Sequence, residues 1–211
     1  MISLQKIILG IGVVAFLASC GNSGKSSSKM TSSSNASAAE QVYVPPGEHD
    51  EFYAFMSGGF SGQLTVYGLP SGRLFRRIPV FSQDAEKGYG YDEETKPMLM
   101  TSEGFVPWDD SHHPELSQTN GVPDGKYIFI NGNNTPRIAR IDLTTFETVE
   151  IIEIPNTAGN HSSPFTTENS EYVVAGTRFS VPVPQRDMSI TEYKGNFKGN
   201  LTFVSVDKED G

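Results

Sequence analysis

Short apolar runs separated by turns rich in glycine, proline and asparagine recur along the chain from about residue 52 onward. The segment 63–67, Gln-Leu-Thr-Val-Tyr, alternates polar and apolar positions, as a half-buried strand does. The segment 127–130 is a continuous apolar run between turn residues and is interpreted as another strand. No segment has the periodicity of an amphipathic helix, and the acidic, glycine-rich stretch 83–100 is interpreted as a loop. The pattern therefore predicts an all-β fold.

The expected strands repeat in the same order: a strand, a turn, a second strand, a tight turn and a third strand. The first copy covers 52–56, 63–67 and 74–81, the second 127–130, 138–142 and 148–154, and the third begins with 172–176 and 200–207. A repeated meander predicts the blades of a β-propeller, whose connections face a central channel. Three blades do not close a ring, so we expect an N-terminal fragment of a longer propeller protein.

Three histidines lie in the insertions between these repeats. His112 and His113 are adjacent and are preceded by Asp109 and Asp110, whereas His161 lies in a loop further along the chain. Neighbouring side chains of a strand point to opposite faces, so we expect the pair on a proline-braced loop, where they converge or bind different edges of a larger cluster. Imidazole suits copper, zinc, iron or nickel, and either aspartate could accept the second ring N–H. The alternative is a pair of surface histidines in a polar loop.

The N-terminus predicts export. Residues 1–19 are interpreted as a signal peptide with an apolar core at 7–18, and Leu17-Ala-Ser-Cys20 resembles the lipobox of bacterial lipoproteins. In that family the cysteine becomes lipidated, so we expect a periplasmic protein anchored to a membrane at Cys20. The alternative is an ordinary secretory peptide. Residues 20–41 form a serine-rich tether, expected to be disordered, and 42–211 form the folded part.

Charge and cysteine content exclude several classes of function. The net charge is -9 and no basic stripe exists, so nucleic acid is not an expected partner. Cys20 is the single cysteine, which excludes an internal disulfide and a thiolate zinc site of the zinc-finger type. The fourth histidine, His49, precedes the first repeat and is expected to be exposed.

From about residue 50 onward, a series of motifs resembles nitrous oxide reductase, and in particular the branch of that family exported by the Sec route. The motifs occur in the family's order and with consistent spacing: Tyr53-Ala-Phe-Met-Ser-Gly-Gly59, Arg77-Ile-Pro-Val-Phe81, Asp110-Ser-His-His-Pro114, Asp124-Gly-Lys-Tyr-Ile-Phe-Ile-Asn131, Arg137-Ile-Ala-Arg140 and Ile154-Pro-Asn156 followed by His161. None of these motifs alone is specific, but their joint occurrence is.

The resemblance implies the N-terminal blades of a seven-bladed β-propeller, followed in the family by a cupredoxin domain. The propeller holds CuZ, a four-copper, sulfide-bridged cluster, and the cupredoxin domain holds the electron-entry site CuA. By position, His112, His113 and His161 match copper ligands of CuZ, and Asp110 matches an acidic residue beside them, expected to accept a hydrogen bond from a ligand imidazole. The remaining CuZ histidines, the calcium-binding segment and the CuA domain are expected beyond Gly211.

The same resemblance implies the last step of denitrification, the two-electron reduction of nitrous oxide to dinitrogen and water. Members of the family are dimers that receive electrons from a c-type cytochrome or a cupredoxin. Because three histidines cannot hold the whole cluster, we expect this chain alone to be inactive. The alternative is a non-enzymatic β-propeller lipoprotein that acts as a binding module. A zinc hydrolase is a weaker option, because no second histidine or glutamate follows at the spacing of such a site.

Overall fold

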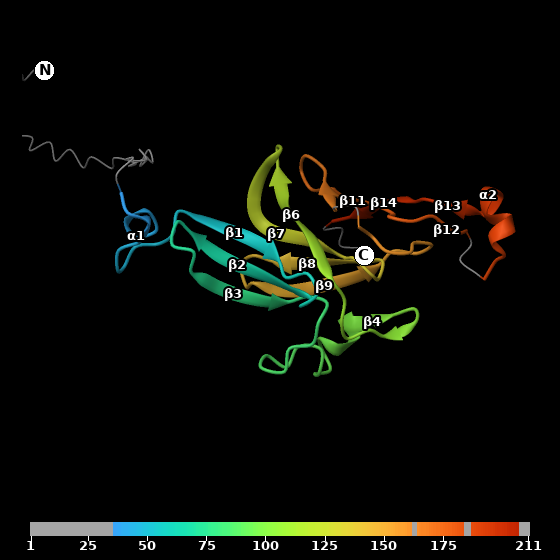
Figure 1. Cartoon of the computed structure of the whole chain (residues 1–211), viewed down its shortest axis with the longest axis horizontal. Coiled ribbons are helices and arrows are strands. Elements are labelled where there is room, and N and C mark those ends of the chain that lie inside the picture. The colour runs from blue at the N-terminus through green and yellow to red at the C-terminus, as the bar shows by residue number, and fades with distance from the viewer. Residues whose placement is uncertain (1–35, 162–163, 184–186, 207–211) are drawn as a thin grey trace, which may run out of the picture. The chain divides into compact units, whose positions relative to one another are not determined.

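The computed structural model describes residues 36–161, 164–183 and 187–206 (Figure 1). The chain divides into two units, Met1–Ala36 and Ser37–Gly211, and every described helix and strand lies in the second. The helices are short, namely α1 (Ala38–Gln41), α2 (Tyr193–Asn196) and the 3-10 turns η1 (Lys96–Leu99) and η2 (Ile190–Glu192). Strands make up most of the regular structure, so the all-β prediction is confirmed.

The strands form three main sheets and two small ones, all antiparallel. The first sheet has the order β1 (Phe52–Ser57), β2 (Gln63–Leu69), β3 (Leu74–Pro79). The second has the order β6 (Ser111–Thr119), β7 (Val122–Gly132), β8 (Arg137–Asp142), β9 (Glu147–Glu153). The third has the order β10 (Phe165–Thr166), β11 (Tyr172–Gly176), β14 (Leu201–Ser205). The two-stranded sheets pair β4 (Met100–Thr101) with β5 (Gly104–Phe105), and β12 (Val181–Pro182) with β13 (Phe197–Lys198).

The repeats predicted from the sequence correspond to the strands observed. Strands β1, β2 and β3 are the first copy, β7, β8 and β9 are the second, and β11 and β14 begin the third. The second and third sheets each carry one further strand beside the repeat, β6 and β10. Successive sheets of this kind fit propeller blades, although the described residues form no closed ring.

The main core lies between the first and second sheets. Its fully buried side chains alternate with half-buried neighbours along β2, because successive strand residues point to opposite faces. They are Leu64, Val66, Ile78, Val80, Phe81, Ile128, Ile130, Ala139 and Ile141. The half-buried pattern of 63–67 thus has its apolar face on this core, as the sequence predicted.

A second core covers the opposite face of the second sheet, which lies between the first and the third. Phe129 and Ile138 point away from the first core and pack with Val173 and Ala175 of the third sheet. Strand β7 is therefore buried on both faces at its C-terminal half, which accounts for the unbroken apolar run at 127–130. This double burial fixes the end of β7 that lies beside the histidines.

A two-residue turn joins β6 to β7. Thr119 pairs with Val122, and Asn120 and Gly121 between them have φ values of 52° and 71°. A hairpin turn with positive φ at both central positions favours Asn-Gly, because these residues adopt that conformation at the lowest cost. The turn sets the pairing of Gln118 with Pro123 and of Thr119 with Val122, and register shifts separate this end of β6 from the rest of the strand.

The N-terminal part of the folded unit differs from the expectation in one respect. Residues 20–41 were expected to lack regular structure, but α1 forms one helical turn at 38–41. Ser37 and Glu40 stabilise it through a capping box, in which each side chain bonds the other residue's backbone N–H. Cys20 and the expected signal peptide lie outside the described residues.

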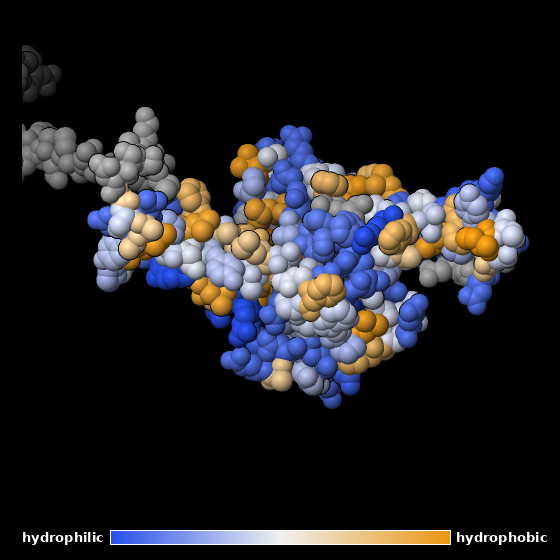
Figure 2. Space-filling view, viewed as in Figure 1, coloured by the Kyte–Doolittle hydropathy of each residue, from blue (hydrophilic) through white to orange (hydrophobic). Residues whose placement is uncertain are grey.

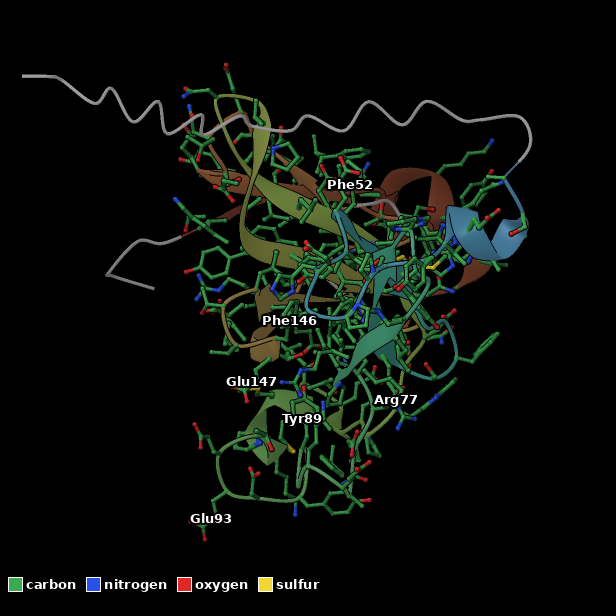
Figure 3. The ribbon with its side chains drawn as sticks, turned by 90° about the vertical axis from the view of Figure 1, so that its left-hand side faces the viewer. Phe52, Arg77, Tyr89, Glu93, Phe146 and Glu147 are labelled. Carbon is green, nitrogen blue, oxygen red and sulfur yellow. The ribbon has the colours of Figure 1, made fainter. Side chains whose placement is uncertain are left out.

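The stretch 83–100 contains mainly turns and bends, with η1 at its end. Tyr89 is its main anchor: the ring is buried, and the hydroxyl donates to the Val80 carbonyl oxygen at 2.7 Å. Burial raises the pKa of this hydroxyl, which therefore stays protonated as a donor. In Figure 3, Tyr89 lies in the lower half of the view below Phe146 and Glu147, and Glu93 lies further out on the loop.

The surface retains large apolar side chains, visible as orange areas in Figure 2. On β14, Leu201 and Phe203 are 66% and 59% exposed, whereas the opposite side of the third sheet packs into the second core. Among the helices that the structure describes, none has the length and apolar character needed to cross a membrane.

Truncation of the core between the first two sheets tests this arrangement. We expect Ile128→Ala on β7 to lower the free energy of unfolding by about 2–5 kcal/mol, because it leaves a cavity in a fully buried position. Val122→Ala on the same strand, where the side chain is 63% exposed, should change it by less than about 0.5 kcal/mol. Urea denaturation checks both values, and equal losses would contradict the packing described.

Candidate metal centre

His112 and His113 lie on strand β6, whereas the sequence predicts a loop at this position. Ser111 pairs with Gly132 and Pro114 with Ile130, so the two histidines face the single residue Asn131 on β7. This arrangement is a β-bulge, which places two residues of one strand opposite one residue of its partner. The bulge rotates neighbouring side chains away from strict alternation, and the two imidazole centroids are 4.3 Å apart. Adjacent histidines of a strand can therefore converge.

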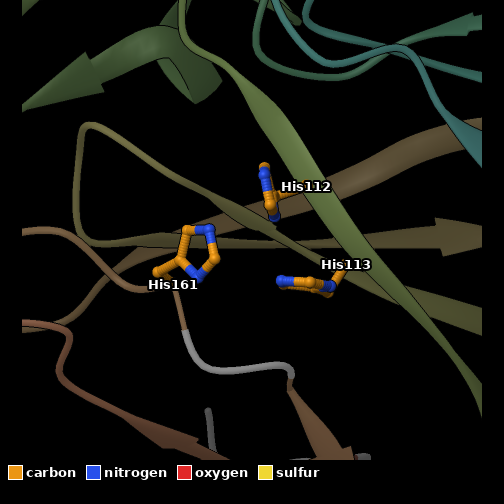
Figure 4. Close-up of side chains that lie close together, drawn as sticks. All are labelled: His112, His113 and His161. Carbon is orange, nitrogen blue, oxygen red and sulfur yellow. The ribbon is translucent and has the colours of Figure 1, made fainter.

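His161 reaches the pair from the segment between β9 and β10. Its ring centroid lies 4.2 Å from that of His112 and 5.1 Å from that of His113 (Figure 4). Two backbone contacts hold this segment: Arg178 N–H donates to the Gly159 carbonyl at 3.3 Å, and Ala158 forms an isolated β-bridge with Phe179. The structure thus brings together all three histidines that the sequence singled out.

The three rings meet the geometric needs of a metal site. One ring nitrogen from each histidine can be chosen so that all three lie within 4.8 Å of one another. Ligands of one ion at 2.0–2.1 Å cannot be more than about 4.2 Å apart, so this spacing fits either slight closure on one ion or neighbouring ions of a cluster. The rings are partly exposed, which leaves a route from solvent. An all-imidazole donor set fits copper or zinc better than magnesium or calcium.

Local electrostatics favour the neutral, metal-binding form of His113 and His161. Partial burial lowers the pKa of His113, and its two histidine neighbours lower it further. Partial burial also lowers the pKa of His161, assisted by His112 and Arg178, whereas the Asp110 carboxylate acts in the opposite direction. Both rings therefore lose their protons below the ordinary histidine range, and protons compete weakly with a metal ion near pH 7.

Asp109 anchors the segment that precedes the histidines. The carboxylate is fully buried and accepts backbone N–H bonds from Asp110 at 2.7 Å and from Asn134 and Thr135 at 3.0 Å each. The Thr135 hydroxyl also donates to it, and the buried Arg137 Nη2 lies 3.6 Å away. Asp109 therefore joins the start of β6 to the turn between β7 and β8, and its oxygens are committed to that role.

Gly132 allows this close approach. A Cβ atom at that position would lie 2.4 Å from the Asp109 Oδ2 atom and 3.1 Å from the Thr135 carbonyl oxygen. A side chain there would displace the carboxylate from its donors. The glycine after Asn131 is thus a requirement of the Asp109 contacts.

Asp110, expected as an acceptor for an imidazole N–H, lies beside the site with one oxygen committed elsewhere. Its Oδ2 atom accepts from the Asn133 side chain at 2.9 Å. Its Oδ1 atom is buried and has no hydrogen-bond partner among the described residues. The same holds for His112 Nδ1 and for both polar atoms of the Asn160 side chain. Unpartnered buried polar atoms are uncommon, and here several gather around one group of histidines.

A cavity lies beside the histidines rather than at them. It has a volume of about 640 Å³ and is lined by Asn133, Gly159 and Arg178 among others, but by none of the three imidazoles. This cavity is therefore separate from the cluster of imidazole rings.

Comparisons with known proteins agree with the family resemblance found in the sequence motifs. No family model matches the chain. A nitrous-oxide reductase from Pseudomonas fluorescens is 37% identical over 189 residues, which cover 85% of this chain and 29% of that protein. A nitrous-oxide reductase from Stutzerimonas stutzeri is 38% identical over 146 residues, which cover 69% of this chain and 23% of that protein. The chain is a relative of the nitrous-oxide reductases.

The nitrous-oxide reductase from Cupriavidus necator extends the same result, at 35% identity over 81% of this chain and 28% of that protein. The chain thus spans less than a third of the length of the nitrous-oxide reductases it matches. Among solved structures, Kuenenia stuttgartiensis hydrazine synthase aligns with a TM-score of 0.36 and 14% identity, over 74% of this chain and 48% of that one. That likeness is too low to inform the fold or the function.

Proton titration tests the electrostatics of the metal-free site. We expect the ring signals of His113 and His161 to titrate with midpoints below 6.5, because partial burial and their neighbours disfavour the charged forms. Asp110→Asn should lower the His161 midpoint further, since the carboxylate favours the protonated ring, and should leave His113 nearly unchanged. NMR of the imidazole C–H signals measures both, and midpoints at or above 6.5 in the wild type would contradict the description.

Proposed function

We propose that this chain supplies His112, His113 and His161 as copper ligands to CuZ, the copper–sulfide cluster of a nitrous-oxide reductase. The observation that carries the proposal is the convergence of these three imidazoles from two separate segments. Their positions also match the ligand positions implied by the family resemblance, and the sequence relatives carry that name. A neutral imidazole set binds copper without adding charge to the cluster.

When bound, such a cluster would supply the two electrons that, together with two protons, convert nitrous oxide to dinitrogen and water. The protein's own contribution at this site is positioning. The bulge of β6 directs His112 and His113 toward one point, and the segment after β9 brings His161 to the same point. Asp110 is proposed as the carboxylate beside these ligands, with its Oδ1 atom available to an N–H donor.

The proposal places this chain within a larger β-propeller. The second sheet is covered on both faces, whereas Leu201 and Phe203 leave the outer face of the third sheet apolar and exposed. A further blade packed on that face would bury these side chains, as the third sheet buries one face of the second. A seven-bladed ring would supply the additional histidines that a four-copper cluster needs.

The same proposal includes properties that the family resemblance implies for the longer proteins. They comprise a homodimer, a CuA domain, calcium, and a c-type cytochrome or cupredoxin as the electron donor. Export to the periplasm and a lipid anchor at Cys20 rest on residues 1–20 of the sequence. The competing assignment is a non-enzymatic binding module, in which the histidines would bind no copper.

Copper titration of the chain tests the ligand assignment. We expect the wild-type chain to bind copper, and His112→Ala/His113→Ala to weaken binding by more than the ~10–100-fold that loss of an outer-shell partner costs, because two direct ligands disappear. The matched control is His49→Ala, which removes an exposed histidine remote in sequence from the cluster and should leave binding unchanged. Equilibrium dialysis with a competing chelator measures the affinities. A wild-type chain that binds no copper would favour the binding module.

Catalysis is tested in a protein that contains this chain together with the further length found in the relatives. Matured with copper and supplied with a reduced donor, it should consume nitrous oxide, and His161→Ala should abolish that activity because the cluster loses a ligand. The 211-residue chain alone should show none, since three histidines cannot hold four copper ions. Gas chromatography of the headspace measures consumption, and His49→Ala again serves as the control. Turnover by the chain alone would contradict the proposal.

A further inference from the structure

Asn131 occupies the position on β7 opposite the two histidines of the bulge. Its side chain is fully buried, in the segment of β7 covered on both faces. A bulge disrupts the ladder locally, so the backbone groups of the extra residue need partners other than the facing strand's backbone. A polar residue in a buried strand at this point therefore has a specific task.

The side-chain amide of Asn131 bonds both segments that carry the histidines. Its Oδ1 atom accepts the backbone N–H of His113 at 2.8 Å. Its Nδ2 atom donates to the carbonyl oxygen of Asn160, the residue before His161. An asparagine amide carries an acceptor oxygen and a donor nitrogen on the same carbon, in one rigid plane. The amide thus fixes how far the backbone at His113 lies from the backbone at His161.

Two other contacts near the cluster act further from the rings. Asp109 holds the turn after β7, and Asn133 joins Asp110 to the Arg178 side chain. Among the bonds that the structure describes, those of Asn131 reach His113 itself and the direct neighbour of His161. Removing this amide would leave a buried N–H and a buried carbonyl without partners, and the two segments would lose their common support.

We propose that Asn131 is a positioning residue that sets the separation of His113 and His161 for copper binding. The inference rests on the proposed function, because copper is the ion for which the spacing matters. Asn131 contributes no ligand atom; it acts through the backbone on each side of the site. Its loss should therefore alter the affinity and the coordination geometry of copper even in a chain that remains folded.

Two variants separate the two bonds. Asn131→Leu removes both of them while it keeps the branching and the number of heavy atoms of the side chain. Asn131→Asp, measured at pH 8, retains an acceptor for the His113 N–H but faces the Asn160 carbonyl with a second oxygen. We expect Asn131→Asp to weaken copper(II) binding by about 10-fold and Asn131→Leu by up to about 100-fold, in line with other residues that orient metal ligands. The electron paramagnetic resonance spectrum of bound copper(II) should change in both.

A matched control separates positioning from general loss of stability. Thr148→Val removes another buried side-chain hydrogen bond, from the Thr148 hydroxyl to the Pro79 carbonyl at 2.7 Å, in the contact between β9 and the end of β3. It should lower the midpoint of urea unfolding but leave copper affinity within twofold of wild type and the copper spectrum unchanged. Should Asn131→Leu fail to fold, the nearly isosteric Asn131→Asp carries the test.

A double-mutant cycle identifies the route of the effect. If Asn131→Asp acts by displacing the segment of His161, its cost in copper affinity should fall to within twofold in a His161→Ala background. Additive losses would overturn the inference, as would a folded Asn131→Asp chain with wild-type affinity and spectrum. A wild-type chain that binds no copper would overturn the proposed function and this inference with it. Wild-type binding with no effect of Asn131 would overturn the inference alone.

Discussion

Burial of both faces of the second sheet, β6 to β9, is the constraint on which the rest of the described structure depends. The first sheet covers one face through Leu64, Val66 and Ile78, and the third covers the other through Val173 and Ala175. A strand buried on both sides cannot slip by one residue without loss of burial on both, so the register of β7 is strongly fixed. That register determines which residue of β7 faces the irregular start of β6, and hence where the histidines lie.

The three imidazoles that we propose as a metal site lie where this rigid frame meets an irregularity, the bulge of β6. At the bulge, side chains of β6 no longer alternate strictly, and some hydrogen bonds of the ladder are lost. Buried polar side chains replace them. The Asp109 carboxylate accepts the backbone N–H of Asp110, and the Asn131 amide oxygen accepts that of His113. The two groups differ in what they hold. Asp109 ties β6 to the adjacent turn of the same sheet, whereas Asn131 connects the sheet to the segment that carries His161. Positioning in a candidate metal site thus depends on residues that offer no ligand atom.

The sequence predicted the repeated strands and the three histidines because both have strong local signals. Strands packed against a core show apolar runs between turn residues, and imidazoles stand out in polar insertions. The convergence of adjacent histidines on a strand was not predictable, since alternation argues against it and a bulge has no reliable local signature. Asn131 ends an apolar run and resembles an ordinary turn residue, and only the pairing of β6 with β7 reveals its two partners. The capping box of α1 was readable from Ser37 and Glu40 but lies beside a serine-rich stretch without periodicity.

The distribution of satisfied and unsatisfied polar groups gives the site its chemical character. Asp109 is surrounded by donors and faces Arg137, so its charge is compensated within the fold. Asp110 has a buried oxygen without such compensation, and His112 has a buried ring nitrogen in the same state. A buried carboxylate oxygen and an imidazole nitrogen left unpartnered cost free energy that a folded protein seldom tolerates without a functional reason. A cation bound by the three imidazoles would relieve both costs, because it would accept the lone pair of a ring nitrogen and attract the nearby carboxylate. These unpartnered atoms therefore support our proposal of a metal-binding site over the alternative of a group of surface histidines.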